Sequence, residues 1–177
     1  MVNRVGNVAA VRRGIYVALG GNVPWQGRIS ADVLRLALGS FPDIGLQVLA
    51  ASRIWESPAW PEGSRAPAYA NAVAHVDTAL GPSQVLEGLH VLEARYGRVR
   101  SERNAPRTLD LDLIDYQSRL SSYPMLPHPR LAGRAFVLVP LAEIAPRWRH
   151  PVTGMRIDRL LRRADRTGMR PLAAPSD

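Results

Sequence analysis

The feature that most constrains the fold is a segment of strict polar–apolar alternation at residues 108–113, which read TLDLDL. Successive side chains of a β-strand point to opposite faces, so one face of this segment is apolar and the other is acidic. The pattern predicts a strand over residues 108–116. Leu109, Leu111 and Leu113 would face a core, and Asp110 and Asp112 would lie together on the opposite face.

The order of the other predicted elements indicates an α+β fold. Apolar runs with a period of two predict strands, and apolar residues at helical spacing predict helices. The expected elements are strands at 15–19, 46–51, 69–78 and 108–116, and helices at 29–39 and 82–96. This βαββαβ order predicts a ferredoxin-like antiparallel sheet with helices on one face. Residues 55–66 are expected to form a loop, and short helical additions are expected at 136–144 and 157–163.

The chain length of 177 residues fits one domain. We expect a single domain over residues 14–164, with a disordered lead-in at 1–13 and a disordered tail at 165–177. No apolar run approaches the ~18–20 residues that span a membrane. The chain has no cysteine, which fits a cytoplasmic protein.

The chain is strongly basic, with a formal net charge of +8, and all 23 of its basic residues are arginines. Such a charge indicates an anionic partner, which could be a nucleic acid, a membrane surface or a polyphosphate. Guanidinium groups bind phosphate oxygens in a bidentate manner, so arginine suits each of these partners. Charge alone does not choose among them.

Asp110 and Asp112 are the strongest candidates for a metal site. Neighbouring carboxylates repel each other unless a cation lies between them, and carboxylates with phosphate oxygens are preferred ligands of Mg²⁺. Two Mg²⁺ ions ~3.5–4 Å apart can stabilise the attacking and leaving oxygens of a phosphoryl displacement. An isolated Asp-Leu-Asp is more often a solvated strand face. The arginine-rich segment at 95–107 favours a polyphosphate site, because a triphosphate needs neutralising groups that also orient it.

Residues 97–112 resemble the signature of the 6-hydroxymethyl-7,8-dihydropterin pyrophosphokinases, the diphosphate-transferring enzymes of folate biosynthesis. The matching pieces are GRVR at 97–100 and PRTLDLD at 106–112. Other segments follow in family order at 16–22, 57–58, 69–73, 127–130, 134–138 and 140–146. The resemblance covers residues 15–161. Gly21 stands where serine is usual, and Asn104 and Ala105 stand where the family's loop carries tryptophan and glycine.

The resemblance implies a role for each matching residue. Asp110 and Asp112 would bind two Mg²⁺ ions. Arg98 and Arg107 would hold the ATP phosphates, and His128 and Arg134 would line the nucleotide side of the site. Arg100 would also contact ATP. The pterin pocket would be formed by Ser57, Pro58, Trp60, Tyr69, Asn71 and Phe136. Of these, Arg98, Arg107 and the two aspartates would take part in catalysis.

The residues themselves support parts of this assignment. Tyr69 and Asn71 are two residues apart on a predicted strand, so they share a face. An aromatic face and an amide together suit a flat heterocycle. Without the motif order, Tyr69 and Phe136 would be interpreted as core aromatics. Glu93, on the helix before the arginine loop, is expected to pair with an arginine and position it, although a solvent-facing charge fits equally well.

The predicted reaction transfers diphosphate from ATP to the hydroxymethyl group of the pterin and releases AMP. Magnesium is the only cofactor expected, and no nucleic acid, membrane or obligate protein partner is expected. One alternative is a ferredoxin-like RNA-binding module, although the aromatic-rich pattern of RNA-recognition sheets is absent and the aspartates would repel a nucleic-acid backbone. The other alternative is a degenerate pyrophosphokinase that binds its substrates and turns over poorly.

Overall fold

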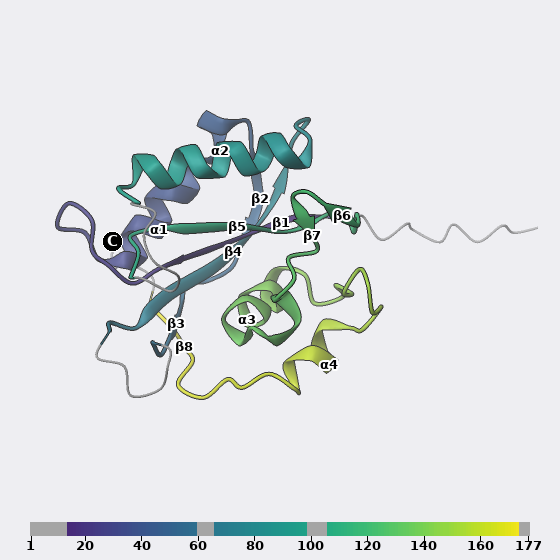
Figure 1. Ribbon diagram of the computed structural model, residues 1–177. Coiled ribbons are helices and arrows are strands. Elements are labelled where there is room, and N and C mark those ends of the chain that lie inside the picture. Colours follow the sequence, from purple (N-terminus) through teal and green to yellow (C-terminus); the bar gives the residue numbers. More distant parts are fainter. Residues whose placement is uncertain (1–13, 60–65, 99–105, 174–177) are drawn as a thin grey trace, which may run out of the picture.

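The structure is a computed structural model that describes residues 14–59, 66–98 and 106–173 (Figure 1). The six strands of the main sheet are β1 (Ile15–Gly21), β2 (Gln47–Ala51), β3 (Trp55–Ser57), β4 (Tyr69–Asp77), β5 (Asp110–Tyr116) and β8 (Arg170–Pro171). The helices are α1 (Ser30–Gly39), α2 (Pro82–Arg95), α3 (Ala135–Ile144) and α4 (Ile157–Leu161). Two 3₁₀ turns, Phe41–Ile44 and Leu131–Gly133, and a hairpin of β6 (Ser121–Ser122) and β7 (Met125–Leu126) complete the described elements.

The sheet has the strand order β5-β1-β4-β3-β8, and β2 also pairs with β4. The pairs of β1 with β4 and with β5 are antiparallel, as the ferredoxin-like prediction requires. Helices α1 and α2 cover one face, and α3 covers the opposite face with α4 packed beside it (Figure 1). The fold class is therefore confirmed, and the C-terminal helices form a third layer on the second face of the sheet.

The third layer exists because both faces of β1 are apolar. Val17 and Leu19 face the core beneath α1 and α2, whereas Tyr16 and Ala18 face the core beneath α3. Burying both faces of a strand gives a continuous apolar run instead of alternation. This accounts for the run at 15–19 in the sequence.

A bulge in β5 ends the alternation that predicted the strand. Val17 pairs with Leu113, but Tyr16 pairs with Asp115, so Ile114 is the extra residue. Ile114 and Asp115 both meet the α3 layer: Ile114 packs in its core, and Asp115 accepts a hydrogen bond of 2.7 Å from the indole of Trp148. The bulge therefore anchors the C-terminal layer to the sheet.

Two expectations about loops and ends are wrong. Trp55–Ser57, expected as a loop, forms strand β3, whose Trp55 pairs directly with Asn71 of β4. The tail expected to be disordered from residue 165 is described as far as residue 173. Its strand β8 pairs with β3, and the Leu172 amide donates to the Ile54 carbonyl at 2.8 Å. Backbone pairing with an open strand edge orders both segments. The expected lead-in at 1–13 lies outside the described residues.

Among the described residues, no helix has both the length and the apolar character needed to cross a membrane.

Candidate active site

Four residues form a row across the sheet at the end where β1 finishes and β5 begins. Gly20 of β1 pairs with Asp110 on one side and with Asn71 on the other, and Asn71 pairs in turn with Trp55. Directly opposed residues point to the same face of a sheet, here the face of α3. Strands lie ~4.8 Å apart, so Asp110 and Asn71 are separated by roughly 10 Å across Gly20. Because Gly20 has no side chain, the space between the Asp110 carboxylate and the Asn71 amide is open.

Asp110 lies between two arginines. Its Oδ2 accepts a hydrogen bond of 2.7 Å from Nη1 of Arg107, and its Oδ1 forms an ion pair with Nη1 of Arg98. The side chains of Asp110, Arg98 and Arg107 are each 20–24% exposed, so the cluster is half-buried but open to a ligand. The predicted meeting of the arginine segment and the acidic strand is present in the structure.

Glu93 of α2 supports this cluster from beneath the sheet. The residue is 2% exposed, and its Oε1 accepts the backbone N–H of Leu111 at 2.8 Å. The same oxygen pairs with Nη1 of Arg98. Leu111 separates the two aspartates, so Glu93 fixes the backbone between them and also holds an arginine that contacts Asp110. The expectation that Glu93 pairs with an arginine is confirmed.

Asp112, two residues along β5, faces His128 and Arg134. Its Oδ2 lies 3.5 Å from Nη1 of Arg134 and 3.8 Å from Nε2 of His128. Burial is the main factor that lowers the pKa of His128, the charges of Arg134 and Arg130 lower it further, and Asp112 opposes the shift. Burial likewise lowers the pKa of Arg134. The structure thus brings both residues predicted for the nucleotide side to the second aspartate.

The turn after β1 holds Arg107 in place. Asn22 is 1% exposed, and its side-chain oxygen accepts the backbone N–H of Arg107 at 3.0 Å. The Arg107 carbonyl accepts N–H groups from Asn22 and Val23 at 2.9 and 3.2 Å. Gly21 permits this approach, because a Cβ there would lie 2.4 Å from the Thr108 carbonyl oxygen.

The amide of Asn71 is oriented by a neighbouring strand. Its Nδ2 donates to the Ser57 hydroxyl at 3.0 Å, and to the Tyr69 and Trp55 carbonyls at 3.3 and 3.5 Å. Its oxygen lies above Gly20, since a Cβ on Gly20 would come within 3.6 Å of it. Asn71 and Ser57 are both buried, so this part of the predicted pterin pocket is a fixed polar edge.

The two aromatic residues predicted for the pterin pocket come from different layers. Tyr69 begins β4, and Phe136 lies in the first turn of α3, where it is 37% exposed and has the Arg134 guanidinium 5.4 Å from its ring centre. The two rings make no aromatic contact with each other in the described part of the chain. Phe136 is therefore not a core aromatic, which was the competing interpretation. Pro58 follows β3 directly and packs against Gly168.

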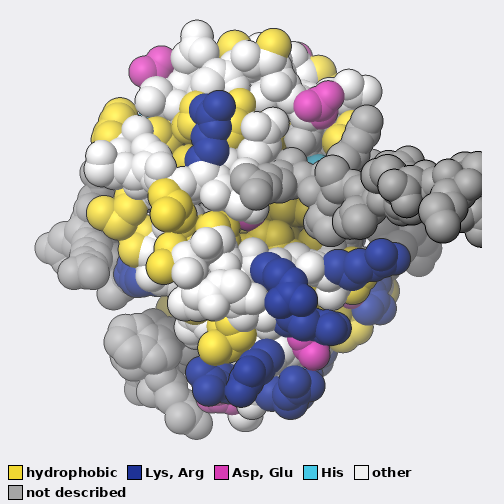
Figure 2. All heavy atoms as spheres, turned by 90° about the vertical axis from the view of Figure 1, so that its right-hand side faces the viewer, with side chains coloured by type: hydrophobic (Ala, Val, Ile, Leu, Met, Phe, Trp, Pro, Cys, Tyr) yellow, Lys and Arg dark blue, Asp and Glu magenta, His cyan; other side chains and the backbone are white. Residues whose placement is uncertain are grey.

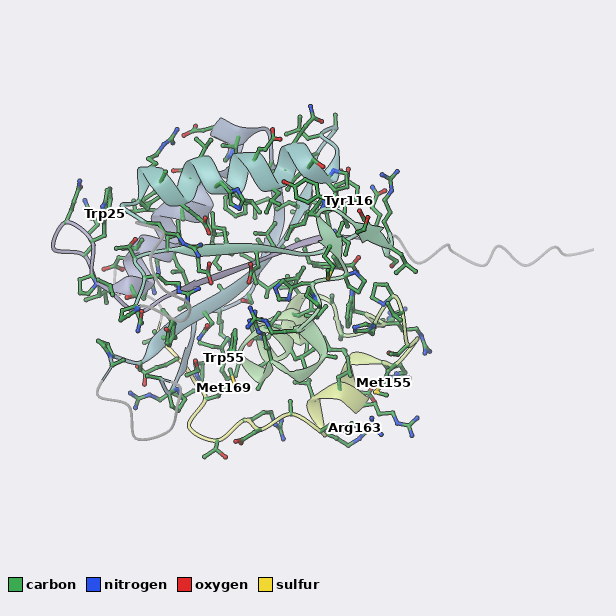
Figure 3. All side chains as sticks on the ribbon, in the orientation of Figure 1. Trp25, Trp55, Tyr116, Met155, Arg163 and Met169 are labelled. Atoms are coloured by element: carbon green, nitrogen blue, oxygen red, sulfur yellow. The ribbon has the colours of Figure 1, made fainter. Side chains whose placement is uncertain are left out.

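Three contributors were not identified from the sequence as site residues: Gly20, Asn22 and Trp55. Trp55 lies on the α3 side of the sheet (Figure 3), and the Arg53 guanidinium is 5.2 Å from its ring centre. Its indole N–H is buried without a hydrogen-bond partner among the described residues. The strand that carries Trp55 is three residues long, too short for a periodic pattern. Trp60 and Arg100, both predicted for the site, lie outside the described residues.

The donor set at Asp110 and Asp112 fits magnesium. The described residues contain no group of three or more histidine, cysteine or acidic side chains arranged to hold a metal ion. Magnesium does not require such a group, because it commonly binds through one or two protein carboxylates together with substrate phosphates and water. Two carboxylates on one strand face, flanked by cationic side chains for the phosphates, satisfy that requirement.

Comparison with known proteins agrees with this geometry. Residues 16–146 match the family model of 7,8-dihydro-6-hydroxymethylpterin-pyrophosphokinase. The chain is 39% identical over 163 residues to 2-amino-4-hydroxy-6-hydroxymethyldihydropteridine pyrophosphokinase of Synechocystis, which covers 90% of this chain and 80% of that protein. The Pseudomonas aeruginosa enzyme of the same name is 38% identical over 141 residues, covering 77% and 83%.

Longer proteins contain the same region. A folic acid synthesis protein of Pneumocystis carinii is 36% identical over 146 residues, which cover 81% of this chain and 19% of that protein. The crystal structure of Plasmodium falciparum HPPK-DHPS superimposes with a TM-score of 0.62 at 12% identity, over 85% of this chain and 43% of that chain, and so shares its fold. On the family match and these relatives, the chain belongs to the 7,8-dihydro-6-hydroxymethylpterin-pyrophosphokinase family.

Proposed function

We propose that the site around Asp110, Asp112 and Asn71 transfers diphosphate from ATP to 6-hydroxymethyl-7,8-dihydropterin. The observation that carries the proposal is the pair Asp110 and Asp112 on one strand face, each with cationic side chains beside it. The pterin hydroxyl oxygen attacks the β-phosphorus, the bond from that phosphorus to the oxygen bridging the α-phosphate breaks, and AMP leaves. The hydroxyl proton passes to solvent.

Asp110 and Asp112 would hold the magnesium, which the family resemblance puts at two ions. Bound there, magnesium would neutralise the phosphate oxygens and the negative charge that develops on the leaving AMP. Both aspartates are partly exposed on the strand face, so their oxygens are accessible to a cation.

Arg98 and Arg107 would change partners when ATP binds. Both now contact Asp110, which is the carboxylate that a cation would neutralise. Arg98 and Arg107 would then be held less strongly by the neutralised Asp110, and they could donate bidentate hydrogen bonds to phosphate oxygens instead. Arg134 and His128, beside Asp112, would contact the nucleotide side in the same way. Arg100 belongs to this set by the family resemblance.

Asn71 would fix the pterin by hydrogen bonding, with Tyr69 and Phe136 on either face of its ring. The amide is held by Ser57, so it presents a fixed acceptor above Gly20. A preorganised polar edge costs little further ordering on binding. Pro58 and Trp60 would complete the pocket.

Positioning and charge neutralisation supply the rate in this proposal. Among the site residues, His128 is the best candidate for a general base. However, it lies beside Asp112, on the proposed nucleotide side of the site and not beside Asn71. Holding two substrates in line can itself account for several kcal/mol of a barrier, and fixed cationic groups account for more. The absence of cysteine fits the cytoplasm as the compartment of this reaction.

The proposal is tested by Asp110→Asn and Asp112→Asn. Each should reduce turnover by at least ~10²-fold, because the lost charge matters most in the transition state. The measurement is AMP release under saturating substrates, with the folded state checked by thermal unfolding. Asp43→Asn is the matched control, since Asp43 is an exposed carboxylate paired with Arg95 away from the site. Near-normal turnover in either aspartate variant would remove that residue from the active site.

A further inference from the structure

A second cationic site lies at the C-terminal end of the fold, outside residues 16–146 that match the family. Residues 147–166 contain seven arginines and two aspartates, so they carry a formal charge of +5 out of +8 for the whole chain. Figure 2 shows arginine side chains gathered on the lower half of one face of the molecule. Figure 1 places α4 in the same half. This charge plays no part in the catalytic site described above.

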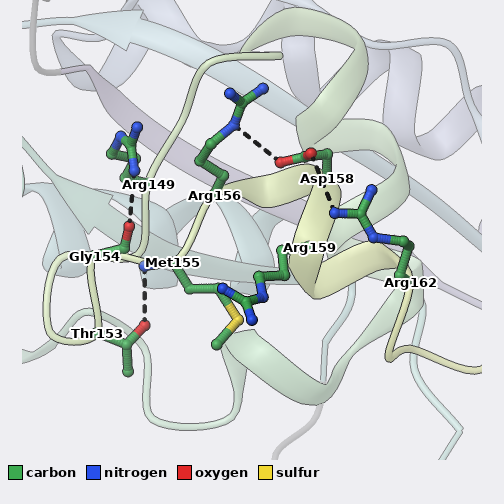
Figure 4. Close-up of a pocket in the computed structure, with 8 residues that line it drawn as sticks. All are labelled: Arg149, Thr153, Gly154, Met155, Arg156, Asp158, Arg159 and Arg162. Atoms are coloured by element: carbon green, nitrogen blue, oxygen red, sulfur yellow. Dashed lines mark hydrogen bonds and ion pairs between the residues drawn. The ribbon is translucent and has the colours of Figure 1, made fainter.

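Part of this charge surrounds a cavity of about 310 Å³ (Figure 4). Its lining residues are Arg149, Thr153, Gly154, Met155, Arg156, Asp158, Arg159 and Arg162. Asp158 is the single acidic residue among them, and it lies between Arg156 and Arg162, with contacts of 3.1 and 3.5 Å. The lining therefore has an excess of three positive charges. The Arg159 backbone N–H donates to the Arg156 carbonyl at 3.0 Å, but its guanidinium group makes no hydrogen bond or ion pair with another described residue.

The arrangement of these arginines opposes stability. Arg149 and Arg156 face each other directly across an antiparallel bridge. Like charges in opposed positions destabilise a strand pair. Arg156, Arg159 and Arg162 also follow one another at three-residue spacing along and beside α4, where side chains are neighbours. Among the described residues, Asp158 is the one acidic side chain that offsets this repulsion. A bound anion would relieve it further.

The backbone beneath the arginines is rigid. The His150 Nδ1 accepts N–H groups from Val152 and Thr153 at 3.2 and 3.4 Å, and the Gly154 amide donates to the His150 carbonyl at 2.8 Å. Trp148, at the base of this turn, is buried and donates to Asp115 of the sheet. The cavity wall is therefore preorganised, and binding would order mainly the arginine side chains.

We propose that this cavity binds a small polyphosphate anion, either inorganic diphosphate or the phosphate groups of a nucleotide. Guanidinium groups bind phosphate oxygens in a bidentate manner, and several of them around one concavity favour two or more linked phosphates over one. The volume lies at the small end of the range for ligand sites. The lining has no aromatic side chain on which a base could stack, which disfavours single-stranded nucleic acid.

The test follows the backbone amides of residues 149–162 by NMR while inorganic diphosphate is added to the full chain at ~0.15 M salt, where diffuse surface attraction is screened. Saturable shifts at these amides are expected. Arg159→Gln should weaken the binding roughly tenfold, the worth of one charge-assisted hydrogen bond. Arg119→Gln is the matched control, because Arg119 is exposed outside the cavity, and it should leave the binding unchanged.

Parallel titrations with ATP, orthophosphate and a single-stranded RNA separate the possible ligands. Tighter binding of ATP than of diphosphate identifies a nucleotide as the ligand, and equal binding identifies the diphosphate group. The proposal is overturned if these amides show no saturable shift, or if both arginine variants weaken binding equally. It is also overturned if orthophosphate binds as tightly as diphosphate, or if RNA displaces diphosphate. Diphosphate that enters the catalytic site is distinguished by shifts near Glu93 and Asp110.

Discussion

At the scale of single residues, the site depends on a buried carboxylate that is not itself accessible to a ligand. Glu93 is 2% exposed, yet it joins the Leu111 backbone and the Arg98 guanidinium through one oxygen. Arg98 also pairs with Asp110, so it keeps one counter-charge when the charge of Glu93 is removed. Glu93 is thus a positioning residue for Asp110, Asp112 and Arg98.

Glu93→Gln tests this role because it keeps an oxygen for the Leu111 amide and removes the charge that holds Arg98. Turnover should fall roughly tenfold, and the free energy of unfolding should fall by ~1–3 kcal/mol. Glu87→Gln, an exposed glutamate on the same helix, is the control. In a double-mutant cycle on kcat/KM for ATP, Glu93→Gln and Arg98→Ala should couple by ~0.5–3 kcal/mol. Additive effects would mean that Glu93 supports the fold alone.

At the scale of elements, the sequence predicts β5 and α2 well and β3 not at all. The alternation at 108–113 has one cause, a strand with one buried face, so it predicts both the strand and the shared face of Asp110 and Asp112. The helix expected at 29–39 is present as α1, in which Leu34 is buried whereas Leu36 is 39% exposed. Several apolar residues there satisfy helical spacing in more than one register, and only the sheet decides which face is covered.

The candidate site likewise has one part that the sequence predicts and one part that it does not. The paired aspartates and their arginines follow from local pattern and motif, and the structure brings them together. The row that joins Asp110 to Asn71 through Gly20 depends on strand register across β5, β1 and β4, which no local pattern contains. Trp55 enters the row through β3, whose three residues are ordered by pairing and not by propensity.

The junction of β1 and β5 gives a prediction at this scale. Gly21→Ser, which introduces the residue usual in the family, should lower the free energy of unfolding by ~1–3 kcal/mol, because its Cβ would meet the Thr108 carbonyl. It should also lower turnover, since Arg107 is held by the same turn. The contrast is Gly20→Ala, whose Cβ meets only ordinary contacts. That variant should keep its stability and lose pterin affinity. A Gly21→Ser protein as stable as wild type would contradict this account.

At the scale of the whole molecule, three layers meet at the site. The sheet supplies the aspartates and Asn71, α2 supplies Glu93, and the start of α3 supplies Arg134 and Phe136. The end of the chain adds β8 on the far edge of β3. Strand β3 therefore depends on a segment more than 100 residues away in sequence, as the ion pair of Arg170 with Glu56 illustrates.

Removing residues 167–177 should loosen β3 because it deletes β8 and the Leu172 packing. The free energy of unfolding should fall by ~1–2 kcal/mol, the worth of one partly buried leucine with its strand contact. Pterin affinity should fall more than ATP affinity, because Ser57 and Trp55 lie on β3 whereas Asp110 lies on β5. Calorimetry with each ligand measures the difference. Removing residues 174–177 alone is the control, and equal losses for both ligands would contradict the coupling.

The group that the enzyme transfers can be identified directly from the products of one incubation. The protein is mixed with ATP, magnesium and 6-hydroxymethyl-7,8-dihydropterin, and the nucleotides and pterins are separated by chromatography. AMP and pterin diphosphate should form in equal amounts, and no AMP should form when the pterin is left out. Formation of ADP with pterin monophosphate, or AMP no higher than in the pterin-free control, would contradict diphosphate transfer.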